Sequence, residues 1–562
     1  MNRQEVLDHL RKNPRVSVLI IGAGVNGIGT FRDLAFQGVD VLLVDRNDFC
    51  SGASAGSSHM IHGGIRYLEN GEFRLVREAV QERNYLIKNA PHYVKPLPTI
   101  IPIFKLFSGL FNAPLKFFGL LDKPSERGAL VIKVGLMLYD AYTGKDRIVP
   151  KHQFFSQQET RKIFSGINPD VIYTARYYDG LLLAPERLCI DMLLDGERAN
   201  PNAHALNYLP AIGSTKNTIT LKDQMTGYIL EIEPRIVINA SGPWIDITNE
   251  KLGYETQFIG GTKGSHLIIH HPGLRQLIGE NEFFFENTDG RIVLISPFED
   301  KVMIGTTDLP VKDPDSVRCT DEEIDYFINM VKIVFPEISI DRDQILFTFS
   351  GVRPLPASES TTTGQISRDH SIQITPPGEK FAFPIYHLIG GKWTSFRAFS
   401  EEVTDKVLIE LDRTRKTSTL EIAIGGGREF PRNSNDFESW INNSASATDS
   451  SKESIRILLA RYGTRSEEFL MQGSTITNKQ LSSLPEFTKE EILHLIQTEK
   501  VVHLDDFVLR RSNIAKSGLS SEAVIVELAE IIGIGLGWTK AQLESEIRRT
   551  SDILKDYHGV EI

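Results

Sequence analysis

The chain has 562 residues, which is too long for one compact core, so two or three domains are expected. Apolar residues make up 41% and charged residues 24%, the composition of an ordinary folded protein rather than a disordered one. The formal net charge of −11 disfavours nucleic acid as a partner, although it does not prevent a local basic cluster from holding a phosphate.

The N-terminal residues 1–14 carry charges throughout and have no apolar core, so we predict no signal peptide. The cysteines Cys50, Cys189 and Cys319 are scattered without CxxC spacing, which indicates neither a disulfide framework nor a structural zinc site, and no metal is expected. A cytoplasmic location in a reducing compartment fits these features. No uninterrupted apolar run is long enough to span a bilayer.

A dinucleotide-binding pattern begins close to the N-terminus. Residues 16–21, VSVLII, predict a buried parallel strand, and the sequence GAGVNG follows at 22–27. A helical pattern then ends near Gly38, and a second strand over 39–44 leads directly to Asp45. Because strand, helix, second strand and acid all have the required spacing, a merely glycine-rich turn is the weaker interpretation.

Each part of this pattern has a physical purpose. Gly22 permits the tight turn, Gly24 lets the backbone approach a pyrophosphate, and Gly27 allows close contact between helix and strand. The helix N-terminus attracts the anion, and Asp45 accepts a hydrogen bond from a ribose hydroxyl.

The next stretch, residues 51–68 (SGASAGSSHMIHGGIRYL), supplies glycine, serine, histidine and arginine where a flavin and an anionic substrate would meet. The competing interpretation of a lone histidine here is a structural one. The residues expected to contact the cofactor are Ser54, Ser57, Ser58, His62, Gly63 and Gly64.

Residues 97–121 carry Lys105 and Lys116 as their only charges, and three prolines interrupt any long helix. Apolar side chains fall at helical spacing between residues 103 and 111, which predicts a short amphipathic helix. One interpretation is peripheral contact with the inner face of the cell membrane. The other is packing on its own domain or on the second subunit of a homodimer, and the pattern does not separate the two.

Two later motifs return to the cofactor. Residues 235–244, RIVINASGPW, predict an apolar strand that leads into a turn of small residues. Residues 389–396, IGGKWTSF, predict a Gly-Gly turn at the start of a helix. Such distant returns suit the long, two-ended FAD better than NAD. The residues expected to approach it are Ala240, Gly242, Gly390 and Gly391.

The predicted fold class is α/β. We expect a discontinuous Rossmann-like FAD-binding domain over about residues 1–90, 170–260 and 345–400. Alternating polar and apolar residues with Asp-Gly turns predict an antiparallel β-sheet substrate cap over about 91–169 and 261–344. Together these segments form an oxidoreductase region that ends near residue 400.

The sequence then changes character. Residues 401–452 include turn-rich, polar stretches and are expected to be a linker. Amphipathic patterns over 453–562 predict a small all-α C-terminal domain, with no evident catalytic set.

At these motifs the chain resembles the FAD-dependent glycerol-3-phosphate dehydrogenases and the related glycerol-3-phosphate oxidases. The matching motifs fall in order and cover roughly residues 15–400, so the resemblance is specific. They are IIGAGVNGIG, SSHMIHGGIRYLENGEFRLVREAVQERNYL, VINASGPW, KGSH, IGTTD, SGVRP, SRDH and GGKWTSFR, with DDFVLRRS at 505–512 as a C-terminal fragment. The resemblance implies FAD as cofactor, oxidation of sn-glycerol 3-phosphate to dihydroxyacetone phosphate, and a quinone as electron acceptor.

That oxidation requires a base for the C2 hydroxyl proton, cations for the phosphate, and groups that stabilise a developing alkoxide. Arg66 and Arg353 are the candidate anion partners, because a guanidinium binds an oxyanion bidentately and stays charged. His266 is the candidate base, since imidazole titrates nearest to neutral pH. A surface ion pair is the competing interpretation for either arginine, and a structural role is the competing one for the histidine.

Three further roles follow less directly. The resemblance implies that Lys392 and Arg368 add positive charge near the flavin or the phosphate. Tyr67 is a candidate wall of the substrate pocket, with a core aromatic nearly as good an interpretation.

The chain departs from the family pattern at two places. The family usually has lysine where this chain has His59, which makes His59 doubtful as a flavin contact. The usual paired acids before Ala-Arg-Leu are replaced by Ala184-Pro185-Glu186, while Arg187 and Leu188 are kept. Both departures bear on the shape of the pocket more than on its chemistry.

Other functions remain open at this stage. Within the enzymes, the alternatives are an oxidase that reduces dioxygen, or a related FAD amine or hydroxy-acid oxidase whose carboxylate substrate would also use two arginines. Outside them, the alternative is a flavin-bearing scaffold whose helical tail binds a partner protein. A scaffold has no need of convergent His, Arg and Lys side chains, so the sequence weighs against it.

Overall fold

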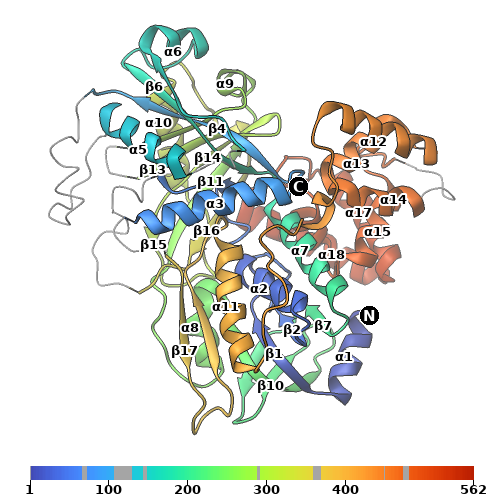
Figure 1. Cartoon of the computed structure of the whole chain (residues 1–562). Coiled ribbons are helices and arrows are strands. Elements are labelled where there is room, and N and C mark those ends of the chain that lie inside the picture. The colour runs from blue at the N-terminus through green and yellow to red at the C-terminus, as the bar shows by residue number, and fades with distance from the viewer. Residues whose placement is uncertain are drawn as a thin grey trace.

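The computed structural model describes residues 2–65, 72–106, 129–142, 148–287, 291–357, 369–448, 450–472 and 480–562. Two β-sheets form the main body, and a group of C-terminal helices packs at one side of both (Figure 1). Within the described residues, the smaller sheet has eight strands and the larger sheet ten.

The smaller sheet is mainly parallel, as the predicted dinucleotide fold requires. Its path runs in the order β17 (Ser371–Thr375), β18 (Ile385–Ile389), β10 (Ile229–Asn239), β1 (Arg15–Ile21), β2 (Val41–Val44) and β7 (Ala203–Leu206). β8 (Ala211–Ser214) and β9 (Ile219–Lys222) extend it beside β10. β1 and β2 are almost continuously apolar because both faces of the sheet are covered.

Helices cover both faces of this sheet. On one face lie α2 (Val25–Phe36), α7 (Pro185–Ala199) and α11 (Phe396–Glu410), whose apolar sides share one core with β1 and β2. On the other face α1 (Arg3–Lys12) inserts Val6, Leu7 and Leu10 against β1. A capping box between Asn2 and Glu5 fixes the start of α1.

The larger sheet is mostly antiparallel and lies above the smaller one in Figure 1. Its path is β15 (Leu309–Pro310), β11 (Thr262–Ile269), β14 (Lys301–Gly305), β13 (Ile292–Phe298), β12 (Glu282–Glu286), β4 (Val94–Ile103), β6 (Tyr173–Leu182) and β3 (Met60–Ile61). β16 (Ile345–Arg353) pairs with β11, and β5 (Gln153–Ser156) pairs with β6.

Helix α10 (Asp321–Val334) packs its apolar side on one face of the larger sheet. Among the described residues before 434, the remaining helices are α3 (Phe73–Asn89), α5 (Ala129–Tyr142), α6 (Gln157–Ile163), α8 (Ile245–Lys251) and α9 (Pro272–Ile278).

The C-terminal helical region comprises the described residues from 434 onward. Its helices are α12 (Ser434–Ala447), α13 (Lys452–Tyr462), α14 (Ser466–Gln472), α15 (Lys489–Thr498), α16 (Leu504–Asp506), α17 (Glu522–Leu536) and α18 (Lys540–His558). Their core includes Phe347 and Phe349 of β16, so the region packs directly on the larger sheet.

Buried ion pairs join this region to the smaller sheet. Asp48, shortly after β2, accepts hydrogen bonds from Arg510 Nε at 2.6 Å and Arg511 Nη1 at 2.7 Å. Burial raises the pKa of Asp48, but the two guanidinium groups outweigh burial and hold the pKa below its ordinary value. Paired in this way, Asp48 stays ionised at neutral pH inside the protein.

The structure differs from the sequence expectations in three places. Residue 103, where the expected helix begins, belongs to β4, which pairs along its whole length with β6, and residues 104–106 are not helical. The rest of the expected helix, from residue 107, lies outside the described residues. β6 and β16, expected with the cofactor-binding part, pair in the larger sheet, and α12 occupies part of the expected linker.

Candidate functional site

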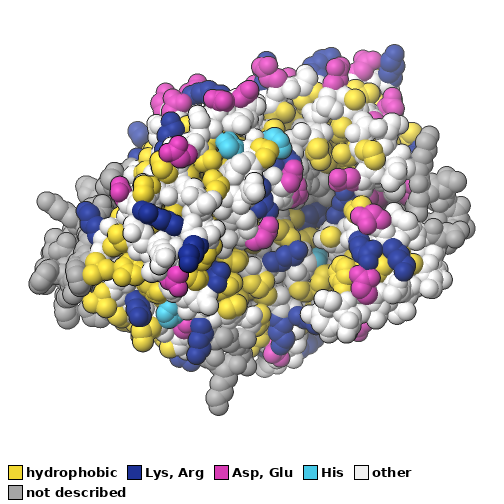
Figure 2. Space-filling model, turned by 90° about the horizontal axis from the view of Figure 1, so that it is seen from above, with side chains coloured by type: hydrophobic (Ala, Val, Ile, Leu, Met, Phe, Trp, Pro, Cys, Tyr) yellow, Lys and Arg dark blue, Asp and Glu magenta, His cyan; other side chains and the backbone are white. Residues whose placement is uncertain are grey.

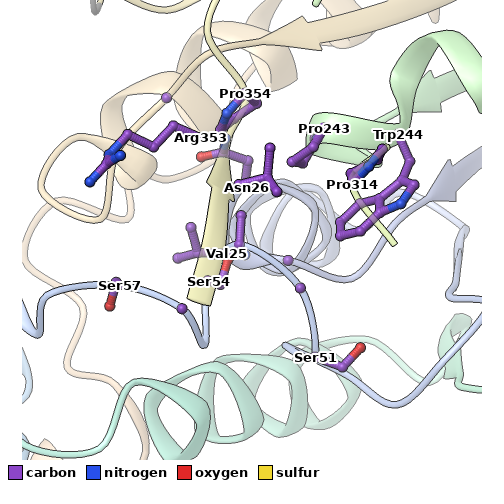
Figure 3. Close-up of a pocket in the computed structure, with 18 of the residues that line it drawn as sticks. Val25, Asn26, Ser51, Ser54, Ser57, Pro243, Trp244, Pro314, Arg353 and Pro354 are labelled. Carbon is purple, nitrogen blue, oxygen red and sulfur yellow. Dashed lines mark hydrogen bonds between the residues drawn. The ribbon is translucent and has the colours of Figure 1, made fainter. Parts of the chain in front are cut away.

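A cavity of about 1840 Å³ is lined by residues of both sheets and of the C-terminal helical region. Figure 3 shows its centre, where Val25 and Asn26 at the start of α2 separate two ends. Arg353 and Ser57 lie toward one end, and Trp244 and Pro314 toward the other. The site is therefore long enough to receive an extended ligand across the start of a helix.

The turn before α2 has the shape that a pyrophosphate needs. Gly22 has a φ of +108°, and a Cβ added there would lie 2.6 Å from the carbonyl oxygen of Ala240. Gly27 does not line the cavity; a Cβ on it would lie 1.9 Å from Gly22 O, so it allows the close helix packing expected of it. Gly24 is the N-cap of α2, and the next amide, Val25 N, donates to Ser54 Oγ at 2.9 Å.

An unsatisfied polar atom marks the same place. Asn26 lines the cavity and donates through Nδ2 to the carbonyl of Gly390 at 3.2 Å, whereas its buried Oδ1 has no hydrogen-bond partner among the described residues. Buried polar atoms are rarely left unpaired in folded proteins, so this oxygen fits a ligand that donates to it.

Asp45 lies at the end of β2 and lines the cavity, as predicted. Its carboxylate accepts hydrogen bonds from the backbone N–H groups of Ala23 at 2.6 Å and Asn47 at 2.9 Å. Burial outweighs these bonds and raises the pKa of Asp45 to about 6. At neutral pH the carboxylate is mostly ionised and can accept a further hydrogen bond from a ribose hydroxyl.

The other predicted cofactor contacts gather around the same cavity. Those that line it are Ser54, Ser57, Ser58, His62, Gly64, Ala240, Gly242, Gly390, Gly391 and Lys392. Gly63 lies behind this wall, where its N–H donates to Asp179 Oδ1 at 3.0 Å. The strands explain the convergence, because β10 lies beside β1 and β18 beside β10, all parallel, so that their C-terminal turns reach the fingerprint.

His266 projects from β11 into the cavity. Its Nε2 lies 2.8 Å from Ser58 Oγ, and its ring stacks on Phe349 with the ring centres 4.7 Å apart. Its Nδ1 is buried without a hydrogen-bond partner among the described residues. Burial, with the nearby Arg353 and Lys516, lowers the pKa of His266 to about 3, so the imidazole is neutral at pH 7.

Arg353 ends β16 and lines the cavity, with about a quarter of its side chain exposed. Nη2 donates to Thr306 Oγ1 at 2.9 Å, and Nη1 donates to the Thr307 carbonyl at 3.1 Å and to Asp308 Oδ1 at 3.2 Å. The guanidinium is thus aimed by the IGTTD segment, which the sequence marked as a motif without giving it a role.

Three of the predicted site residues, Arg66, Tyr67 and Arg368, lie outside the described residues, so their roles stay predictions. His59 does not line the cavity; it is buried behind Ser58, close to Lys516 of the C-terminal helical region. In the described part of the chain, no group of three or more His, Cys, Asp or Glu side chains is arranged to hold a metal ion.

Sequence reasoning missed a cluster at the other end of the cavity. Asp315 forms an ion pair with Arg46 and accepts a hydrogen bond from Trp244 Nε1 at 2.8 Å. The Arg46 guanidinium also lies 4.8 Å from the centre of the Trp244 ring. Arg46 directly follows Asp45, which was a usable signal, whereas nothing in the sequence links Asp315 to the site.

The family comparisons agree with this geometry. A model described as FAD dependent oxidoreductase matches residues 17–382, and one described as the C-terminal domain of alpha-glycerophosphate oxidase matches residues 417–543. The chain is 31% identical to a glycerol-3-phosphate dehydrogenase of Synechocystis sp., over 97% of each chain. It is 28% identical to an aerobic glycerol-3-phosphate dehydrogenase of Staphylococcus haemolyticus, over 96% of this chain and 94% of the relative.

Two solved structures share the fold. A glycerol-3-phosphate dehydrogenase from Bacillus halodurans complexed with FAD superposes with a TM-score of 0.75 at 22% identity, covering 99% of this chain and 97% of that one. An L-alpha-glycerophosphate oxidase from Mycoplasma pneumoniae with FAD bound gives a TM-score of 0.53 at 17% identity, covering 72% and 98%.

Proposed function

The chain belongs to the FAD-dependent oxidoreductases and, within them, to the glycerol-3-phosphate dehydrogenase family, and we propose that it oxidises sn-glycerol 3-phosphate to dihydroxyacetone phosphate. The observation that carries this proposal is that His266 and Arg353 line one cavity with the serine turn at Ser57 and Ser58. A neutral base and a fixed guanidinium there match the two needs of an alcohol phosphate.

FAD is the cofactor of this family, and the turn at Gly22, the start of α2 and the carboxylate of Asp45 fit its diphosphate and ribose. When bound, FAD accepts the hydride that leaves C2 of the substrate. Gly390, Gly391 and Lys392 line the same cavity, where Gly390 contacts Asn26 at the start of α2, and would lie near it.

His266 takes the proton of the C2 hydroxyl in this scheme. The O–H bond breaks toward the imidazole, C2 loses its hydrogen with the bonding electron pair, and a carbonyl forms at C2. Ser58 Oγ holds one ring nitrogen and Phe349 holds the ring plane, so the base stays oriented without a charged partner. Its neutral state at pH 7 keeps it ready to accept the proton.

Arg353 binds the anionic end of the substrate or the developing alkoxide. Its contacts to Thr306, Thr307 and Asp308 fix the guanidinium while leaving part of it open to the cavity. Arg66, Arg368 and Lys392 supply further positive charge in this proposal, and Tyr67 forms a wall of the pocket.

We propose a quinone as electron acceptor, with the enzyme in peripheral contact with the membrane that dissolves it. An apolar face of α5 supports this contact: Leu130, Val134, Met137 and Leu138 are each 41–57% exposed and share one side of the helix. No described helix is long and apolar enough to cross a membrane. Basic and acidic side chains are interspersed over the described part of the face drawn in Figure 2, which therefore presents no broad basic surface.

The central experiment is the visible spectrum of the purified holoenzyme under anaerobic conditions, before and after addition of sn-glycerol 3-phosphate. We expect the flavin band to bleach and to return on addition of a quinone analogue faster than on admission of air. A band that stays unchanged refutes the substrate assignment, and faster return in air identifies an oxidase instead.

Membrane contact has its own test. We expect the holoenzyme to float with vesicles of phosphatidylcholine and phosphatidylglycerol, and Met137→Gln/Leu138→Gln to reduce the floated fraction several-fold. Ile409→Gln removes an exposed apolar side chain from α11 and serves as control. Equal flotation of both variants refutes the contact, and a change from dimer to monomer in sedimentation assigns the face to a homodimer.

A further inference from the structure

The loop between residues 512 and 520 of the C-terminal helical region carries a lysine into the protein interior. Lys516 is only 4% exposed. Its Nζ donates to Glu186 Oε1 at 2.6 Å, at the start of α7, and lies 3.3 Å from His59 Nε2. The next residue anchors the loop to the larger sheet, because Ser517 Oγ donates to Glu299 Oε2 at 2.7 Å.

From Lys516 two short routes lead to His266. His59 directly follows Ser58, whose hydroxyl lies 2.8 Å from His266 Nε2. Phe349 provides the second route, since Lys516 Nζ lies 5.7 Å from the centre of its ring and His266 stacks on the same ring. Both supports of the imidazole, the serine turn and the aromatic ring, therefore contact one cation.

The serine turn needs such support. His59 has a φ of +54°, in the left-handed region that side chains other than glycine seldom adopt. A backbone conformation of this kind persists where surrounding contacts hold it. His59 is held by Lys516 and packs between Phe298 and Phe349, with ring centres 5.8 Å and 6.2 Å away.

We propose that Lys516 is a positioning residue for His266, through which the C-terminal helical region holds the base of the active site in place and beside a cation. The inference rests on the proposed function in taking His266 as the base. Lys516 does not line the cavity, so it acts through His59, Ser58 and Phe349 and touches neither substrate nor cofactor.

Electrostatics give the cation a second effect. Burial first, then Lys516 and His266, lower the pKa of His59, just as Lys516 contributes to the lowered pKa of His266. Two neutral imidazoles consequently lie beside one ammonium group whose charge is balanced by Glu186. The titratable and charged groups around His266 are Arg353 of β16, Lys516, His59, Glu186 of α7 and His558 at the end of α18.

Lys516 joins two segments that lie far from it in the sequence. His59 and Glu186 both contact this lysine, which the C-terminal helical region supplies. The cation beside the serine turn therefore comes from a distant part of the chain.

The test compares holoenzyme variants that change this charge in different ways. Lys516→Met/Glu186→Gln removes both charges, so that no buried carboxylate is left unpaired, and Lys516→Arg keeps the cation. His59→Lys/Lys516→Met moves the cation to position 59. Lys500→Met is the matched control, because Lys500 also pairs with α7, through Glu197 at 3.0 Å, but has no route to His266.

We expect Lys516→Met/Glu186→Gln to retain its flavin band and to lose 10- to 100-fold in the anaerobic rate of flavin reduction at saturating substrate. KM should change less than threefold. The acid limb of kcat/KM against pH should move to higher pH, because Lys516 contributes to the lowered pKa of His266 and Glu186 does not. Lys516→Arg and Lys500→Met should leave the limb in place, and His59→Lys/Lys516→Met should recover part of the rate.

A crystal structure of Lys516→Met/Glu186→Gln makes the test independent of the substrate assignment. We expect the Ser58 Oγ to His266 Nε2 distance to lengthen beyond hydrogen-bonding range. An unmoved imidazole with an unmoved acid limb overturns the positioning role. If the wild-type flavin is not reduced by sn-glycerol 3-phosphate, the proposed function fails instead, and the two failures are distinct. Should the double variant not fold, Lys516→Arg decides, since a shifted limb in it contradicts the proposal.

Discussion

Replacement of Arg353 by alanine tests the proposed anion site most directly. The guanidinium contacts the segment 306–308 and lines the cavity. A charge-assisted hydrogen bond contributes about 1.5–3 kcal/mol, and a donor that stabilises developing charge about 3–4 kcal/mol. A loss of about 2–4 kcal/mol corresponds to a decrease in kcat/KM of roughly 30- to 1,000-fold.

The assay is anaerobic stopped-flow reduction of the bound flavin by sn-glycerol 3-phosphate, with flavin content measured from the absorbance of the same samples. Arg353→Lys retains the charge without the planar fork, and we expect an intermediate rate. The acid limb of kcat/KM in Arg353→Ala should also move to higher pH, because Arg353 helps to lower the pKa of His266. Equal losses of flavin content and of catalysis would refute the assigned role.

Three other variants test the base, the cofactor turn and the C-terminal contact. His266→Asn should slow flavin reduction about 10²- to 10⁴-fold at pH 7 with flavin content kept, as measured in single turnovers; a loss below tenfold argues against a base. Gly22→Ala should lose FAD, since the added Cβ would lie against the carbonyl oxygen of Ala240. Gly38→Ala is the control, because Gly38 is also at positive φ but its added Cβ would meet only the Lys416 ammonium. The ratio of flavin to protein absorbance measures the FAD content of both variants. Asp48→Asn should lower the free energy of unfolding by about 3–5 kcal/mol, measured in urea, because it removes the buried carboxylate that pairs with Arg511 and shares Arg510 with Asp505 and Asp506. The pKa of Asp48 in the folded protein lies below the unfolded value of about 3.9. The difference in free energy of unfolding between wild type and variant should therefore be largest near neutral pH and shrink as the pH falls below about 4. A difference that does not change with pH contradicts the pairing.

The cofactor half of the site could be predicted because its signals are local. The fingerprint from Gly22 to Asp45 lies within one strand–helix–strand unit, whose geometry places all its parts together. The returns at Ala240 and Gly390 were predicted for a related reason. Each follows an apolar strand, and strands of a parallel sheet bring their C-terminal ends to the same edge, where β1 already ends.

The helix expected over residues 103–111 shows where local periodicity fails. Its first residue belongs to β4, whose ten residues all pair with β6. Pro96, Pro98 and Pro102 share one parity along this strand, so the N–H groups they lack all belong to the same edge. On its other side, β4 pairs with β12 at Thr99 and Ile100, between the prolines. Pairing with a distant strand therefore decides the structure here, and the prolines that would interrupt a long helix are accommodated in β4.

The role of the C-terminal helical region could not be predicted, because its charges find their partners across most of the chain. Lys516 meets Glu186, 330 residues away, and Arg511 meets Asp48, 463 residues away. Buried charges are costly unless paired, so each pair specifies one way for the region to dock. Asp48 lies three residues after Asp45, and His59, which contacts Lys516, lies one residue after Ser58 beside His266, so the docked region packs close to both Asp45 and His266. A helical region that was only tethered to the rest of the chain would not bury charged side chains such as Lys516 and Arg511 against the two sheets.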